Sequence, residues 1–250
     1  MCPIKIRLCL FVLILFFHCA RDQAPLQPEK KGTRIPSSMP QYDIPWPSLA
    51  SSPWPMAVVN PQGVARSNYP GPMKGKIRWT AKVGEYGKNQ SGMAIGPDQT
   101  IYMGLNSSRG GNGFIALNPD GQVRWTIPWI ERNYFTGPVI SADTTIFIGG
   151  AFFRALTAGG SEKWNRKGTI IFYDLRPLLG RDGTIYTKDG TDDIYAFAPN
   201  GQLKWHTFIE NGYDNYTYLV ASPDGSVIYT QGNIALAALN AQTGDILWSR

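Results

Sequence analysis

The sequence predicts an all-β protein built from repeated units of short antiparallel strands. Of its 250 residues, 43% are hydrophobic and only 17% are charged, and the chain holds 27 Gly and 19 Pro. A long coiled coil would carry more charge and less Gly and Pro. A disordered chain would carry fewer aromatic residues than the 12 Tyr, 11 Phe and 8 Trp present here. The second observation is that three short phrases recur together along most of the chain.

The first phrase is Gly-x-x-x-Trp, with Lys or Arg directly before the tryptophan in its first four copies. It ends at Trp79, Trp125, Trp164, Trp205 and Trp248, with spacings of 46, 39, 41 and 43 residues. The second phrase is a turn followed by a β-branched and an aromatic residue, and it begins at Asp98, Asp143, Asp182 and Asp224. The third is Ala-Leu or Ala-Phe, about ten residues before each of the last four tryptophans.

Each phrase has a structural interpretation. Asp-Gly-Thr-Ile-Tyr, as at residues 182–186, places a turn before a strand. Asn118-Pro-Asp-Gly121 lies between two strand-like runs and has the residues of a hairpin turn. A four-stranded meander of about 40 residues cannot bury both faces, so such units must stack as the blades of a β-propeller. We expect the five tryptophans to provide the contacts between neighbouring units.

The run Ala238-Leu-Asn-Ala-Gln-Thr-Gly-Asp-Ile-Leu-Trp248 resembles the tryptophan-docking phrase of the quinoprotein-like (PQQ-like) β-propeller repeat family. The resemblance covers residues 52–250 and implies antiparallel four-stranded blades. Residues 52–56 and 63–67 resemble the segment that opens the first blade in bacterial members. The family usually closes rings of seven or eight blades, whereas this sequence contains about four whole units and one further strand at residues 73–80. We expect a truncated propeller, the alternative being a small ring that the N-terminal strand completes.

Residues 1–19 predict a secretory signal peptide. Lys5 and Arg7 precede an apolar run of ten residues, which as a helix would cover about 15 Å, half of a bilayer core of about 30 Å. Cys19 ends this run and resembles the acylated cysteine of bacterial lipoproteins. We expect Cys19 to be lipidated, the alternative being that it is discarded with the leader. Residues 20–51 are rich in proline and predict a tether between the membrane and the folded domain.

The sequence offers no convincing catalytic, cofactor-binding or metal-binding residue. His206 is the one histidine after the leader, and Asp189, Asp192 and Asp193 are expected to form a solvated hairpin loop. The enzymes of the family hold a calcium-bound quinone at the propeller axis, but no carboxylate here matches their catalytic position. The net charge of +6 comes without a dense basic stripe, so we expect no nucleic-acid partner.

We therefore expect a non-enzymatic β-propeller lipoprotein of the bacterial cell envelope, on the periplasmic side or at the outer membrane. The resemblance implies a protein-binding scaffold similar in plan to the propeller lipoprotein of the machinery that inserts outer-membrane β-barrels. That relative recruits partners through its loops and strand edges. Exposed aromatic residues between units would contact protein partners here: Trp129, Tyr134, Tyr213 and Tyr216. The alternatives are a degenerate or truncated quinone-dependent dehydrogenase and a carbohydrate- or surface-binding module.

Overall fold

The computed structural model divides the chain into two units, Met1–Asp43 and Ile44–Arg250. All described residues belong to the second unit, and they are 44–63, 74–83, 92–105, 112–128, 136–150, 152–167, 176–189, 193–209, 218–231 and 236–250. Within these residues there is no helix, and sixteen strands form four four-stranded antiparallel sheets. The all-β prediction is confirmed.

Each sheet is a meander in which consecutive strands are neighbours. Blade 1 comprises β1 (Met93–Ile95), β2 (Ile101–Gly104), β3 (Asn112–Leu117) and β4 (Val123–Pro128). Blade 2 comprises β5 (Val139–Ile140), β6 (Ile146–Ile148), β7 (Phe152–Leu156) and β8 (Glu162–Lys167). Blade 3 comprises β9 (Leu178–Leu179), β10 (Ile185–Lys188), β11 (Asp193–Phe197) and β12 (Leu203–Phe208). Blade 4 comprises β13 (Val220–Ala221), β14 (Val227–Gln231), β15 (Leu236–Asn240) and β16 (Ile246–Ser249).

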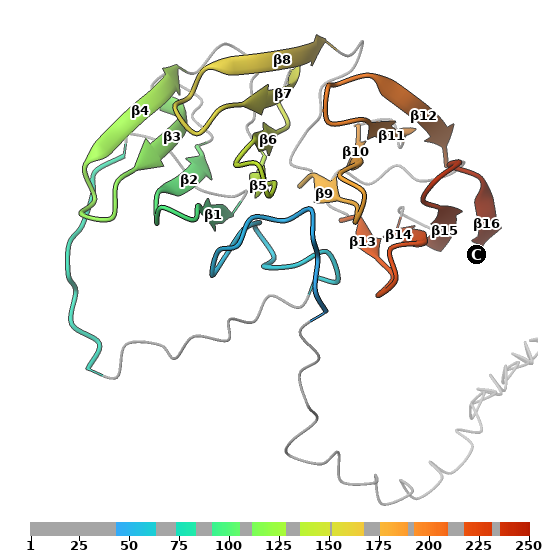
Figure 1. Cartoon of the computed structure of the whole chain (residues 1–250), viewed down its shortest axis with the longest axis horizontal. Helices are drawn as coiled ribbons and strands as arrows, with labels where there is room; N and C mark the ends of the chain where they lie inside the picture. The colour runs from blue at the N-terminus through green and yellow to red at the C-terminus, as the bar shows by residue number, and fades with distance from the viewer. Residues whose placement is uncertain are drawn as a thin grey trace, which may run out of the picture. The chain divides into compact units, whose positions relative to one another are not determined.

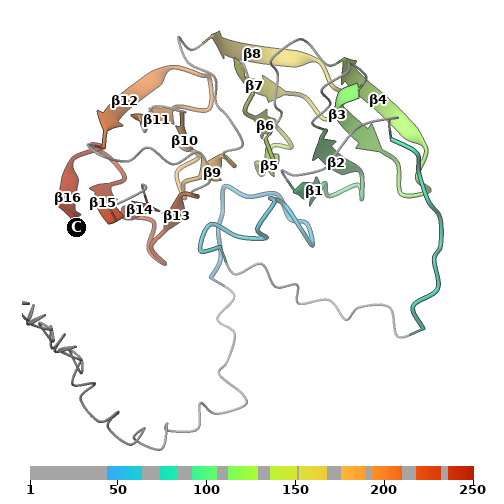
Figure 2. The ribbon, with the colours of Figure 1, turned by 180° about the vertical axis from the view of Figure 1, so that it is seen from behind.

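The four blades follow one another around an arc, with the first strand of each blade on the inside and the tryptophan-bearing fourth strand on the outside (Figure 1). The opposite view shows the same order (Figure 2). The blades do not close into a ring: within the described residues β16 pairs only with β15, and Lys74–Val83 lies against blade 1. The small ring completed by the N-terminal strand is therefore not formed.

The recurring phrases account for the strands. In every blade the Asp carboxylate accepts the backbone N–H two residues later, as Asp182 does from Thr184 at 3.0 Å, which closes the turn before the second strand. The residue after the Asp has a positive φ in all four blades. It is Gly183 or Gly225 in blades 3 and 4, but Gln99 (65°) or Thr144 (63°) in blades 1 and 2. The pairing between the third and fourth strands of each blade shifts register within the Ala-Leu or Ala-Phe phrase.

Four of the five repeat tryptophans pack on the glycine turn of the following unit. The Trp125 indole N–H donates to Ala158 O at 3.0 Å, and a Cβ at Gly160 would lie 2.7 Å from its ring. Trp79, Trp164 and Trp205 repeat this arrangement on Gly121, Gly201 and Gly244. Only glycine allows the ring this close, because any other residue would place a Cβ against the indole. Each of these turns also has a positive φ near 80–87°, which glycine adopts without strain. Trp248 lies on the outer strand of blade 4 and is 41% exposed.

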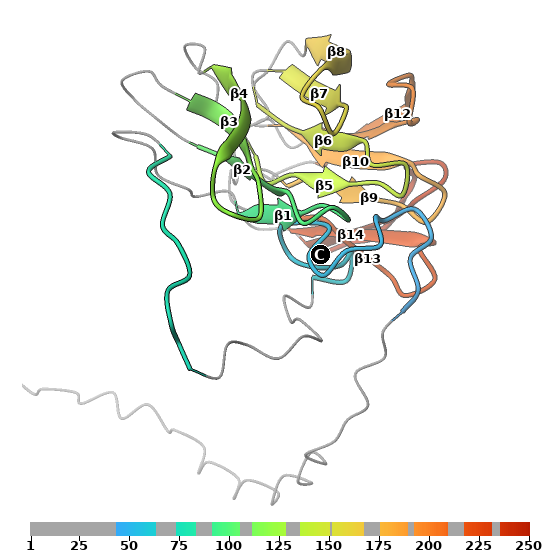
Figure 3. The same ribbon diagram turned by 60° about the vertical axis from the view of Figure 1, so that its left-hand side comes forward.

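Residues 44–63, which we call the hub segment, lie inside the arc (Figures 1 and 3). The hub segment hydrogen-bonds the innermost strand of every blade. Ile95 N–H donates to Trp54 O at 2.7 Å in blade 1, and Ile140 N–H donates to Pro55 O at 2.9 Å in blade 2. The Trp46 indole donates to Leu179 O at 2.8 Å in blade 3, and Ala221 N–H donates to Pro61 O at 2.8 Å in blade 4.

The hub segment changes the domain boundary that we expected. Residues 44–51, assigned to the tether, belong to the folded unit, where Trp46 is only 8% exposed and Ala50 N–H donates to Ile140 O at 3.0 Å. Residues 52–56 do not open the first blade but cross the inner edges of blades 1 and 2. Proline is compatible with both positions, because its carbonyl can still accept hydrogen bonds from strand edges.

Candidate functional site

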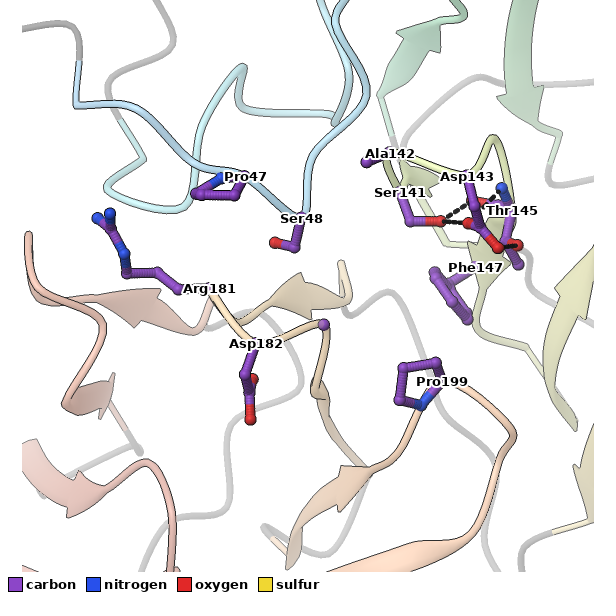
Figure 4. Close-up of a pocket in the computed structure, with 11 residues that line it drawn as sticks. Pro47, Ser48, Ser141, Ala142, Asp143, Thr145, Phe147, Arg181, Asp182 and Pro199 are labelled. Carbon is purple, nitrogen blue, oxygen red and sulfur yellow. Dashed lines mark hydrogen bonds between the residues drawn. The ribbon is translucent and has the colours of Figure 1, made fainter.

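A groove of about 370 Å³ lies between blades 2 and 3, beside the hub segment (Figure 4). Its walls come from the first turn of each of the two blades and from Pro47 and Ser48 of the hub segment. Smaller cavities of about 330 and 140 Å³ occupy the corresponding positions between blades 3 and 4 and between blades 1 and 2. A cavity at this position recurs between successive blades because the blades repeat. The groove between blades 2 and 3 differs in that Pro47 and Ser48 of the hub segment line it.

Two carboxylates, Asp143 and Asp182, lie on different sides of this groove (Figure 4). Partial burial by itself raises the pKa of Asp143. Hydrogen bonds from Ser141 and Thr145 and the nearby Lys163 ammonium outweigh burial and lower the pKa to about 2. The pKa of Asp182 is also lowered, since burial is outweighed by hydrogen bonds from Thr184 and Lys204. Both side chains are therefore anionic at neutral pH.

These carboxylates belong to a clamp that blades 1 to 3 share. In blade 2 the Lys163 ammonium lies 3.4 Å from Asp143 Oδ2 and donates to Thr145 Oγ1 at 2.7 Å. Arg124 with Asp98 and Thr100, and Lys204 with Asp182 and Thr184, form the same clamp in blades 1 and 3. Blade 4 has Leu247 where the cation would stand, and Asp224 is held by Ser222 and Ser226.

The groove has the chemistry of a binding surface. The Ser48 hydroxyl donates to Gly180 O at 2.6 Å, and the Ser141 hydroxyl donates to Asp143 at 2.5 Å. A carboxylate with a pKa of about 2 is a weak general base at neutral pH, so the Ser141–Asp143 pair is poorly suited to activate a nucleophile. The groove instead presents anionic and hydroxyl groups beside Pro47, Pro199 and Phe147, a mixture suited to polar recognition.

The residues predicted to contact partners, Trp129, Tyr134, Tyr213 and Tyr216, lie outside the described residues, as does Cys19. His206 is on β12, where its ring stacks on Tyr195 and its Nε2 lies 4.0 Å from an Asp193 oxygen. Within the described residues no cluster of three or more His, Cys, Asp or Glu side chains could hold a metal ion. In that same part of the chain, no helix is long and apolar enough to cross a membrane.

One expectation about these acidic residues was wrong. Asp189 is not in a solvated turn: it is buried and accepts the Tyr195 hydroxyl at 3.0 Å and the Asp193 N–H at 3.1 Å. Burial and the neighbouring Asp189 raise the pKa of Tyr195 well above its ordinary value. Asp192 lies outside the described residues.

Sequence reasoning missed both the clamp and the hub segment. The clamp had a detectable signal, because Lys or Arg before the tryptophan recurs with the same period as the Asp-x-Thr phrase. The hub segment had no such signal in the sequence, because its hydrogen-bond partners lie from about 40 to more than 130 residues away and follow no periodicity.

Comparisons with known proteins agree with this architecture. The family model described as outer membrane protein assembly factor BamB matches residues 71–250. No curated protein is detectably similar in sequence. Among solved structures, quinohemoprotein alcohol dehydrogenase from Comamonas testosteroni is similar with a TM-score of 0.64 at 14% identity, over 79% of this chain and 40% of that one. BamB from Moraxella catarrhalis is similar with a TM-score of 0.51 at 18% identity, over 68% of this chain and 51% of that one.

These likenesses in structure establish the fold, and the chain spans 40% and 51% of the lengths of the two solved proteins. The family model covers well over half of the chain, and the repeat predicted from the sequence is present in the four blades. The chain therefore belongs to the PQQ-like β-propeller repeat family, whose model is described as outer membrane protein assembly factor BamB.

Proposed function

We propose that this protein is a non-enzymatic, lipid-anchored scaffold of the bacterial envelope that binds other proteins through the outer strands and loops of its blades. The family model supports this proposal, because its description is that of an outer-membrane assembly factor. The location would be the periplasmic side of the envelope or the outer membrane, with Cys19 as the lipid attachment site.

The observation that carries the proposal is the hub segment. It hydrogen-bonds the innermost strands of all four blades. A ligand that approached these strands from inside the arc would have to displace buried Trp46 and Met56. The outer strands, by contrast, present apolar side chains to solvent, including Val123, Leu203 and Phe208. Exposed apolar groups of this kind favour protein partners.

A pull-down from envelope extract tests the scaffold. The full chain is immobilised in detergent, and retained proteins are identified by mass spectrometry. We expect a defined envelope protein to be retained, and to be lost when Trp129, Tyr134, Tyr213 and Tyr216 are all changed to Ala. Met93→Ala, which changes an exposed side chain of the innermost strand β1, serves as the control and should retain it. Equal retention by the fourfold variant would remove these residues from the proposed surface.

A quinone titration tests the absence of enzymatic function. Visible absorbance of the full chain is followed as pyrroloquinoline quinone is added with Ca²⁺. We expect no saturable spectral change, and a stoichiometric change would contradict the proposal. Metabolic labelling with a fatty acid tests the anchor: label should be incorporated in the wild-type chain and lost in Cys19→Ser.

A further inference from the structure

The glycine turn between β11 and β12 carries an amide side chain directly before its glycine. The pair is Asn200-Gly201, whereas Asp, Gly or Thr stands before the glycine in the other three turns that receive a repeat tryptophan. Asn200 is exposed and Gly201 is buried. An asparagine followed by glycine is prone to lose ammonia, because the glycine nitrogen can attack the side-chain amide with no Cβ in its way.

This reaction joins the Gly201 nitrogen to Asn200 Cγ and breaks the bond between Cγ and Nδ2. The Gly201 nitrogen loses its proton and Nδ2 leaves as ammonia, so that a five-membered succinimide ring remains. Solvent water then opens the ring at one of its two carbonyls and leaves either aspartate or isoaspartate at position 200. In isoaspartate the main chain runs through Cβ and Cγ, which lengthens the backbone by one methylene group.

Both reacting groups are engaged in the folded turn. Gly201 N–H donates to Ala198 O at 2.8 Å, and Asn200 Oδ1 accepts the Gln202 N–H at 3.0 Å. The first hydrogen bond must break before the Gly201 nitrogen can lose its proton and turn toward Asn200 Cγ. The reaction therefore requires the turn to open.

Two side chains of β8 in blade 2 hold this turn closed. The Trp164 indole N–H donates to Pro199 O at 2.8 Å, and Arg166 Nε donates to Gly201 O at 2.5 Å. The Trp164 ring also covers Gly201, where a Cβ would lie 2.7 Å from Trp164 Cδ2. We propose that Asn200 is a deamidation site that the docked Trp164 protects, and that it reacts when blades 2 and 3 separate.

The isoaspartate product prevents the same docking from forming again. Pro199 O and Gly201 O accept the two hydrogen bonds from β8, and the extra methylene group lies between these carbonyls. Trp164 and Arg166 are two residues apart on one strand, so the spacing of the donors does not change with that of the acceptors. Because isoaspartate does not revert to asparagine, the reaction permanently marks a chain in which this junction has opened.

Peptide mapping of the full chain during incubation in mildly alkaline buffer tests the protection. Mass spectrometry follows the conversion of each asparagine. We expect Asn200 to react about tenfold faster or more in Trp164→Ala than in the wild type, because the turn loses both the indole hydrogen bond and the ring packing. Trp125→Ala is the matched control, since it removes the same contact from the Gly160 turn. Asn200 should react at the wild-type rate in that variant.

Asn112-Gly113, the same pair of residues at the start of β3, shows whether a variant is folded. If Trp164→Ala accelerates Asn112 as much as Asn200, that chain has unfolded and Arg166→Met decides. Arg166→Met removes the hydrogen bond to Gly201 O and should accelerate Asn200 alone. A wild-type rate at Asn200 in the folded variant, or equal acceleration by Trp125→Ala, overturns the proposal.

Urea unfolding tests the consequence of the reaction. The isoaspartate-containing chain is separated by chromatography after the incubation and compared with Asn200→Asp, which has the same charge but no extra methylene group. We expect the isoaspartate chain to unfold at a lower urea concentration than Asn200→Asp. Equal midpoints would show that the lengthened turn still receives Trp164, which would overturn the permanent mark.

Discussion

The contact between Trp125 and Gly160 allows the stacking of the blades to be tested by a single methyl group. Gly160 has a φ of 87°, and a Cβ there would lie 2.7 Å from Trp125 Cδ2 and 3.0 Å from Cε2. Gly160→Ala therefore costs the strain of a left-handed alanine, about 1–2 kcal/mol. It also forces the indole away from the turn, which costs about 1–3 kcal/mol.

Gly183→Ala is the matched control, because its φ of 84° is almost the same. The nearest atom to a Cβ there is Pro199 Cγ at 3.3 Å, which requires only a small adjustment. We expect this variant to lose about 1–2 kcal/mol, the cost of the backbone alone. The two losses should differ by about 1–3 kcal/mol, the cost of displacing Trp125.

The assay is urea unfolding followed by circular dichroism, with both variants required to keep the m-value of the wild type. In the background of Trp125→Ala the extra cost of Gly160→Ala should disappear, because the clash no longer exists. Equal losses for Gly160→Ala and Gly183→Ala would show that Trp125 does not pack on this turn.

Three further predictions concern stability. Trp46→Ala should lower the free energy of unfolding in urea by about 3–5 kcal/mol, because the ring is buried and its N–H donates to Leu179 O. Phe208→Ala, which changes an exposed side chain, should lower it by less than about 1 kcal/mol. Equal losses for the two variants would show that the hub segment does not pack firmly on the blades. Thr144→Gly should stabilise blade 2 by about 0.5–1 kcal/mol, since Thr144 has a φ of 63°, and a lower thermal midpoint would refute this. The pKa of Asp143 is about 2 in the fold against an ordinary 3.8, so its contribution is complete above pH 4 and is lost as the pH falls toward 2. Its side chain is 66% exposed, which limits the effect to below about 1 kcal/mol, and Asp143→Asn should remove that part of the acid dependence of unfolding.

The blades could be predicted because their determinants are local in sequence. A single repeat contains both the turn, such as Asp182-Gly183, and the tryptophan that follows it, so its strands can be predicted from that repeat alone. The periodicity then predicts which repeat packs beside it. The docking of Trp125 on Gly160 follows from the same period, since a glycine must stand wherever an indole approaches the backbone so closely.

The hub segment could not be predicted, because its role depends on distant partners. Pro45 and Pro47 lie in the part of the hub segment that was predicted to be a tether, and Pro55 and Pro61 lie beyond it. Pro55 and Pro61 act through their carbonyls, which accept hydrogen bonds from Ile140 and Ala221. Proline content alone does not distinguish a solvated spacer from an irregular segment that satisfies strand edges. Asp189 was misjudged for a similar reason: its partner Tyr195 is on the next strand, and nothing in the loop sequence shows that the pair is buried.

The central claim is that the hub segment binds the inner edges of the blades as part of the fold. Hydrogen exchange of the full chain, measured at single amides, tests it most directly at Ile95, Ile140 and Ala221, which donate to carbonyls of the hub segment at 2.7–2.9 Å. We predict that these three amides exchange as slowly as those in the middle strands of the blades. Exchange at the rate of exposed strand edges would contradict the claim and return residues 44–51 to the tether.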